Sequence, residues 1–143
     1  EPTTSLDVIV EAQILGDVQY LKEEFNLTMI LITHNLGVLA QTADDIAIMY
    51  AGQMVETNTT EVLFESPQHP YTQALLQSVP DVTRPDKKLT WIGGAPPDLI
   101  DPPQGCMYHP RCEQATEICK VKEPHLIESN TGGYVACHMY GRR

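Results

Sequence analysis

The chain has 143 residues, of which 42% are hydrophobic and 20% charged, a composition typical of a folded globular protein rather than a disordered one. A formal net charge of −10 would repel nucleic acid and anionic membrane surfaces, so we expect no nucleic-acid partner. The longest apolar run, residues 46–51, is far shorter than the roughly 20 residues that span a bilayer. No secretory signal is visible, so we expect a cytosolic chain with reduced or metal-bound cysteines.

The first predicted helix begins at Thr4 and ends near Phe25. Its opening residues T-S-L-D match a capping box, in which a hydroxyl and a carboxylate satisfy free amides at a helix start. One face carries an apolar stripe that we expect to pack on a sheet. The next segment, residues 28–33, reads TMILIT and predicts a strand buried on both faces of a parallel sheet, with His34 at its C-terminal end.

The following elements are short. We expect a helix over residues 35–43, strands over 46–50 and 53–57 turned at Ala51 and Gly52, a helix from Thr59 or Thr60 to Phe64, and a helix after Pro70. From Pro80 the chain becomes rich in proline and glycine, which indicates a linker with one brief strand candidate at 89–92. We expect the rings of Tyr71, Trp91 and Tyr108 to pack rather than to bind a ligand.

The last part, residues 105–141, has too few large apolar residues to form a core of its own and holds all four cysteines. These cysteines are separated by 5, 6 and 17 residues: Cys106, Cys112, Cys119 and Cys137. Structural zinc sites more often use closer pairs, whereas iron–sulfur clusters accept wider spacings. The spacing favours a metal site and leaves disulfides and free thiols open as alternatives. His109 and His138 are alternative ligands or outer residues of such a site.

The segments EPTTSLD (residues 1–7) and ILITHNL (30–36) closely resemble the second half of the nucleotide-binding subunit of ABC transporters. The resemblance implies that Glu1 orients or deprotonates the attacking water and that His34 contacts the ATP γ-phosphate. It also implies that Ser5, Leu6 and Asp7 reach a second ATPase subunit and so contribute to the nucleotide site. Such positioning is what phosphoryl transfer requires.

Other motifs of that family are absent from this sequence. No G-x-x-x-x-G-K-[ST] phosphate-binding loop occurs, and the Q-loop, the signature motif and the aspartate before Glu1 are missing too. We therefore expect a C-terminal fragment of an ATPase, or the product of a truncated gene, that alone neither binds ATP tightly nor hydrolyses it. ATP and Mg²⁺ would bind only in the intact protein. Without its neighbouring strand, the edge of residues 28–33 would favour self-association or partial refolding of the first helix.

Two later segments resemble one particular branch of this family. SPQHPYTQALLQSVP (66–80) and GAPPDLIDPPQGCMYHPRC (94–112) resemble the C-terminal extension of the oligopeptide and dipeptide branch of these ATPases. Tyr108 stands where that family usually has phenylalanine. The resemblance implies that the four cysteines hold a [4Fe-4S] cluster, with zinc as the alternative. We expect the cluster to be structural, because it would join loops that lack a hydrophobic core.

These observations predict an α/β fold, the C-terminal part of a P-loop NTPase (ABC ATPase) domain over residues 1–79, followed by a linker and a small irregular Cys-rich extension over 80–143. The implied function is that of the ATP-hydrolysing subunit that energises peptide import, with transmembrane permease subunits as partners at the cytoplasmic face of the membrane. The alternative is a non-enzymatic metal-binding or regulatory module.

Overall fold

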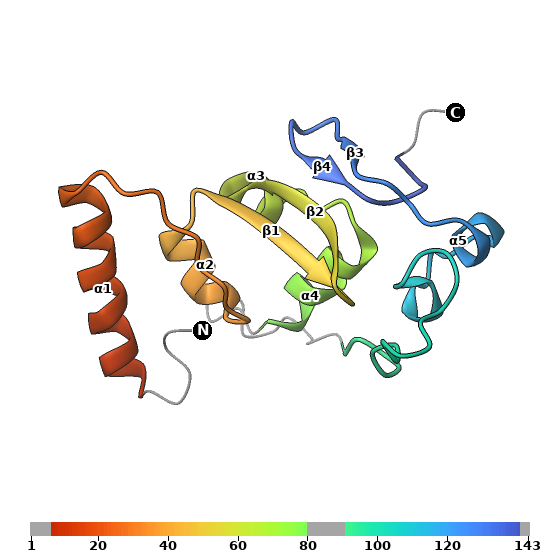
Figure 1. Cartoon of the computed structure of the whole chain (residues 1–143), viewed down its shortest axis with the longest axis horizontal. Helices are drawn as coiled ribbons and strands as arrows, with labels where there is room; N and C mark the ends of the chain where they lie inside the picture. Colours follow the sequence, from red (N-terminus) through yellow and green to blue (C-terminus); the bar gives the residue numbers. More distant parts are fainter. Residues whose placement is uncertain (1–6, 80–90, 141–143) are drawn as a thin grey trace. The chain divides into compact units, whose positions relative to one another are not determined.

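The computed structural model describes residues 7–79 and 91–140 and divides into two compact units, Glu1–Asp44 and Asp45–Arg143 (Figure 1). The first unit holds two helices, and the second holds the sheet and the remaining helices. Nothing tests the predicted division at residues 79 and 80, which stays a prediction. Among the described residues, no helix combines the length and apolarity needed to cross a membrane.

The first helix, α1, spans Val8–Glu24. Its N-cap is Asp7, whose Oδ1 accepts hydrogen bonds from the backbone N–H groups of Ile9 at 3.0 Å and Val10 at 2.9 Å. The predicted start at Thr4 is wrong, because Asp7 is the cap itself and does not lie within the first turn; Thr4 lies outside the described residues. The predicted end near Phe25 is confirmed, since Phe25 is the C-cap.

Residues 28–33 do not form a strand, which corrects the prediction of a strand in a parallel sheet. Burial still alternates along the segment as it would in a strand: Met29 and Leu31 are half-buried, whereas Ile30 is 89% and Ile32 is 73% exposed. A strand requires a neighbour for its backbone N–H and C=O groups, and no described strand pairs with this segment. The alternating burial agrees with the apolar pattern, but the described residues offer this segment no neighbouring strand.

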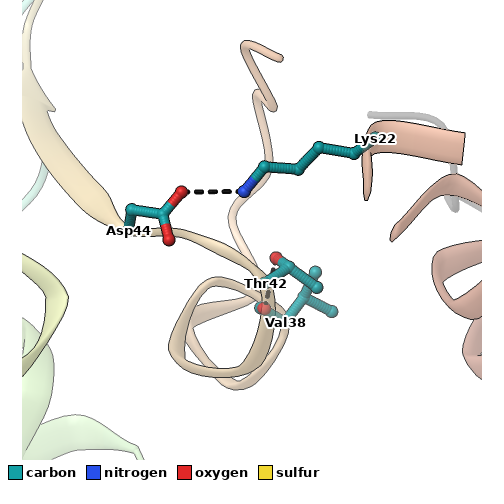
Figure 2. Close-up of polar contacts among 4 residues, drawn as sticks. All are labelled: Lys22, Val38, Thr42 and Asp44. Atoms are coloured by element: carbon teal, nitrogen blue, oxygen red, sulfur yellow. Dashed lines mark hydrogen bonds and ion pairs between the residues drawn. The ribbon is translucent and has the colours of Figure 1, made fainter. Parts of the chain in front are cut away.

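Helix α2 spans Leu36–Thr42, within one residue of the prediction, and its N-cap is Asn35. Leu36 and Val38 are buried. Figure 2 shows the hydroxyl of Thr42 donating to the carbonyl oxygen of Val38 at 2.8 Å, and the ammonium of Lys22 paired with the carboxylate of Asp44 at 2.7 Å. That ion pair holds the pKa of Asp44 below its usual value. It joins the last turn of α1 to the end of the first unit.

The second unit is built on a hairpin of β1 (Asp45–Tyr50) and β2 (Gln53–Thr59). Ala51 and Gly52 both have positive φ, as a tight hairpin turn requires, so the predicted hairpin is confirmed. Two short strands from the cysteine-rich part, β3 (Ile127–Glu128) and β4 (Tyr134–Val135), extend it into an antiparallel sheet of order β1-β2-β4-β3 (Figure 1). The mixed α/β class is confirmed, with an antiparallel sheet.

Four short helices complete the described part of this unit. Helix α3 (Thr60–Glu65) and helix α4 (Pro70–Ser78) confirm the predicted pair, although no side chain caps α3. A 3-10 turn, η1 (His109–Arg111), and helix α5 (Glu117–Val121) follow in the cysteine-rich part. Residues 89 and 90 of the predicted strand lie outside the described part of the chain, and residues 91 and 92 are not in a strand.

The core of the second unit lies between the sheet and the helices that follow it. Its apolar side chains are Ile46, Ile48, Tyr50, Val55, Leu63, Tyr108 and Val135. The rings of Tyr71 and Tyr108 pack on Tyr50, with centroids 4.6 and 5.1 Å from it, as predicted. The prediction that Trp91 packs is wrong, because its side chain is 88% exposed in an irregular segment rich in glycine and proline.

Candidate functional site

The residues assigned to nucleotide chemistry are described only in part. Glu1, Ser5 and Leu6 lie outside the described residues, so their assignment stays a prediction. Asp7 is exposed, and its carboxylate caps α1. His34 is also exposed and directly precedes the N-cap of α2.

The backbone around His34 is held by local hydrogen bonds on both sides. The Thr33 hydroxyl oxygen accepts from the N–H of Asn35 at 3.0 Å, and the Asn35 Oδ1 accepts from Gly37 N–H at 3.0 Å. These contacts fix the backbone on both sides of His34. The role of His34 at the γ-phosphate stays a prediction.

The four cysteines converge in the second unit. All four are half-buried free thiols, and all line one small cavity. The cavity measures about 20 Å³, room for about one water molecule, so a larger group would require the surrounding loops to move outward. Three histidines also line it: His69, His109 and His138. The four cysteines thus line one cavity, and their role as metal ligands stays a prediction.

Backbone hydrogen bonds bring the cysteine-bearing loops together. The N–H of Cys106 donates to the carbonyl oxygen of Cys119 at 2.8 Å, which joins the loop before η1 to α5. The N–H of Cys112 donates to the carbonyl oxygen of His109 at 3.3 Å, at the end of η1. Gly105 makes the first contact possible, because it has φ of +75° and a Cβ there would collide with the Cys119 carbonyl.

Four cysteine thiols are the ligand set of one kind of metal centre, the iron–sulfur cluster. No three His, Cys, Asp or Glu side chains among the described residues are gathered closely enough to hold a single metal ion. A four-iron cluster differs, because each thiolate binds a different iron and the sulfurs need not meet at one point. Four thiols around one cavity are chemically suited to such a cluster.

Burial governs the protonation of these thiols. It raises the pKa of Cys106 and of Cys112, and it raises the pKa of Cys137 to about 11. The three thiols are therefore protonated at neutral pH in the chain alone. Metal binding to them must release protons, because the thiolate is the ligand.

Two buried polar side chains, His69 and Glu56, were not among the predicted site residues. His69 is 1% exposed and caps α4: its Nδ1 accepts a hydrogen bond from the N–H of Tyr71 at 3.0 Å. Burial lowers the pKa of His69 to about 4, so its ring is neutral. Glu56 on β2 is 2% exposed and accepts from the N–H groups of Gln68 and His69. One sequence feature could have identified His69 as a helix cap: it directly precedes Pro70, at the start of a predicted helix.

Comparison with known proteins supports the assignment of this part of the chain. Residues 55–119 match the family model described as oligopeptide/dipeptide transporter, C-terminal region. The match includes β2, α4 and three of the four cysteines, at positions 106, 112 and 119. It therefore covers most of the structure around the cavity.

Curated relatives extend the similarity to nearly the whole chain. The dipeptide transport ATP-binding protein DppD of Caldanaerobacter subterraneus subsp. tengcongensis is 44% identical over 98% of this chain and 43% of its own length. Its Escherichia coli K12 counterpart is 42% identical over 96% of this chain and 42% of its own length. The oligopeptide transport ATP-binding protein AppD of Bacillus subtilis 168 is 42% identical over 98% of this chain and 43% of its own length.

The chain thus spans less than half the length of these relatives. The matches cover 96–98% of the chain, so they include most of the segments on which the resemblance rests. Residues 55–119 are thus similar to the C-terminal region of oligopeptide and dipeptide transporters, and nearly the whole chain is similar to ATP-binding proteins of dipeptide and oligopeptide transport.

Proposed function

We propose that this chain forms the C-terminal part of an ATP-hydrolysing subunit that powers peptide uptake by an ABC transporter. The observation that carries the proposal is the identity of 42–44% to dipeptide and oligopeptide transport ATP-binding proteins over nearly the whole chain. In the complete subunit, Glu1 acts on the attacking water and His34 on the γ-phosphate. Ser5, Leu6 and Asp7 face the second ATPase subunit. ATP and Mg²⁺ bind only when the phosphate-binding loop is present.

The test of the nucleotide site uses a complete subunit whose C-terminal part is this chain. Glu1→Gln should abolish ATP hydrolysis and leave nucleotide binding intact, because the amide cannot accept a proton from water. Glu24→Gln, on the exposed end of α1, is the matched control and should hydrolyse ATP normally. Unchanged hydrolysis in the Glu1 variant would overturn the assignment. Saturable ATP binding by residues 1–143 alone would contradict the expected need for the missing motifs.

A [4Fe-4S] cluster held by Cys106, Cys112, Cys119 and Cys137 is the second part of the proposal. The convergence of four free thiols on one cavity supports it. The bound cluster would cross-link loops that have little hydrophobic core. For this cluster the chain would supply the four cysteine thiolates as ligands, together with the backbone N–H groups next to them.

Chemical analysis of protein purified without oxygen tests the cluster. About four iron atoms and about four acid-labile sulfides per chain would support it. Zinc near one per chain would favour the zinc alternative, and no metal with intact disulfides would overturn both. Cys112→Ser should lose metal and melt at a lower temperature than the wild type, whereas equal metal content and equal melting would count against the site.

The partners follow from the same proposal. We propose that the complete subunit pairs with a second ATPase subunit and with transmembrane permease subunits at the cytoplasmic face of the membrane. The relatives are named as transport ATP-binding proteins, which supports this placement. The alternative, a non-enzymatic metal-binding or regulatory module, would be favoured if the native gene lacked a phosphate-binding loop and a signature motif.

Self-association of this chain through residues 28–33 is a further part of the proposal. The exposure of Ile30 and Ile32 and the absence of a paired strand in the described residues support it. Sedimentation of the wild type and of an Ile30→Lys/Ile32→Lys variant would test it. Association that the double variant abolishes is expected, and a wild-type monomer with α1 intact would contradict it.

A further inference from the structure

His34 lies in an irregular stretch of the first unit, directly before a helix that is anchored by burial. Residues 28–35 belong to no helix or strand, so no regular backbone ladder fixes the main chain at His34. Helix α2 follows, and its residues Leu36 and Val38 are buried. The backbone of His34 is therefore determined by the way in which the chain enters this helix.

Asn35 joins the irregular stretch to the helix. Its backbone is extended, with φ of −88° and ψ of 99°. Its side-chain Oδ1 accepts hydrogen bonds from the N–H groups of Gly37 at 3.0 Å and Val38 at 3.3 Å. Gly37 leaves room for this contact, because a Cβ there would lie 3.2 Å from that oxygen. One acceptor thus satisfies two amides of the first turn and fixes the residue that directly follows His34.

Thr33 holds the same residue from the other side of His34. Its hydroxyl oxygen accepts the N–H of Asn35 at 3.0 Å, and this N–H belongs to the peptide bond between His34 and Asn35. The two neighbours of His34 are therefore linked to each other, and the second of them is linked to α2. Each link depends on one side-chain oxygen, so a single substitution can remove it.

The position of a group matters in phosphoryl transfer, because the protein catalyses this reaction mainly by positioning and by electrostatic stabilisation. A displacement of about 1 Å can lower the rate about 100-fold. We propose that Asn35 is a positioning residue of the nucleotide site: with Thr33, it holds the backbone from which His34 meets the γ-phosphate. The inference rests on the proposed function, in which His34 makes that contact. Asn35 acts through His34 and not on ATP itself.

Paired substitutions in the complete subunit test the two acceptor oxygens. Asn35→Ala removes the cap of α2, whereas Asn35→Asp keeps an oxygen at the position of Oδ1. Thr33→Val removes the acceptor of the Asn35 N–H with little change in side-chain volume, whereas Thr33→Ser keeps it. Thr42→Val is the matched control, because it removes a hydroxyl that donates to the Val38 carbonyl oxygen at the far end of α2 (Figure 2). The kcat, the KM for ATP and the melting temperature of each variant are measured.

Asn35→Ala and Thr33→Val should lower kcat about 10–100-fold and leave the KM for ATP near the wild-type value, since the γ-phosphate contact is only one part of ATP binding. Asn35→Asp and Thr33→Ser should keep kcat close to that of the wild type. Thr42→Val should also keep it, even with a lower melting temperature. Normal kcat in Asn35→Ala would overturn the inference, as would a kcat that only follows the melting temperature across the variants. The Thr33 pair decides in the same way if Asn35→Ala does not fold.

His34→Ala distinguishes a failure of the proposed function from a failure of this inference. If His34→Ala hydrolyses ATP as the wild type does, the proposed role of His34 is wrong and the inference falls with it. If His34→Ala loses hydrolysis and Asn35→Ala keeps it, only the role of Asn35 is wrong.

Discussion

Glu56 and His69 are joined across the second unit, with the carboxylate Oε2 of Glu56 accepting the backbone N–H of His69 at 2.9 Å. The other carboxylate oxygen accepts the N–H of Gln68 at 2.7 Å. Both side chains are buried, so the carboxylate is satisfied by two amides at the start of α4. Through this contact β2 holds the helix start that carries His69 to the cysteine cavity.

Glu56→Ala should therefore destabilise the chain. The change leaves two buried N–H groups without an acceptor, at a cost of roughly 2–4 kcal/mol. Urea unfolding followed by circular dichroism measures the difference. Glu128→Ala, an exposed glutamate on β3, is the matched control and should change the free energy of unfolding by less than about 0.5 kcal/mol. Similar effects of the two substitutions would mean that the Glu56 carboxylate does not support α4.

The burial of His69 predicts a pH dependence of stability. Its folded pKa, about 4, lies below the usual 6.5, so the unfolded chain binds the proton more readily between these values. The resulting stability is present above pH 6.5 and is lost as the pH falls towards 4, up to about 3 kcal/mol in all. His69→Gln should remove this part of the slope in the metal-free chain. His125→Gln, at an exposed position, should keep it; equal slopes in the two variants would contradict the prediction.

Gly105 is expected to tolerate no side chain. Its φ of +75° disfavours other residues, and a Cβ would collide with the backbone at Cys119 and Lys120. Gly105→Ala should lower the free energy of unfolding by about 1–3 kcal/mol, because the loop bearing Cys106 must move. Gly93→Ala meets no atom within 4 Å and serves as the control. Chemical unfolding of both variants measures the difference, and normal stability of Gly105→Ala would show that the loop contact is dispensable.

Thr72 offers a substitution that should stabilise the chain. Its side chain is fully buried, and within the described residues its hydroxyl has no hydrogen-bond partner. Thr72→Val removes that unsatisfied group and should raise the free energy of unfolding by about 1 kcal/mol. Thr131→Val should do the reverse, because the Thr131 hydroxyl accepts from Asn58 and Gln68. Chemical unfolding of both variants checks the pair, and a less stable Thr72→Val would refute the prediction.

The local elements of this protein could be predicted from its sequence because local chemistry determines them. The turn at Ala51 and Gly52, the helix capped by Asn35 and the helix that begins at Pro70 follow from turn residues, caps and apolar spacing within a few positions. The chemical type and spacing of the cysteines, visible without a fold, also predict a common site, and its metal stays a prediction. The family followed from short motifs in the same way.

Only the tertiary structure could show the features that depend on contacts between residues distant in the sequence. Residues 28–33 have the composition of a buried strand, but no described strand pairs with them, and pairing rather than composition makes a strand. The structure also joined β4 to β2, which brought the cysteine-rich part onto the hairpin. It placed His69 beside thiols 37 or more positions away. Burial, tautomer and hydrogen-bond direction arise only from such contacts, so no local pattern could have assigned His69 its place.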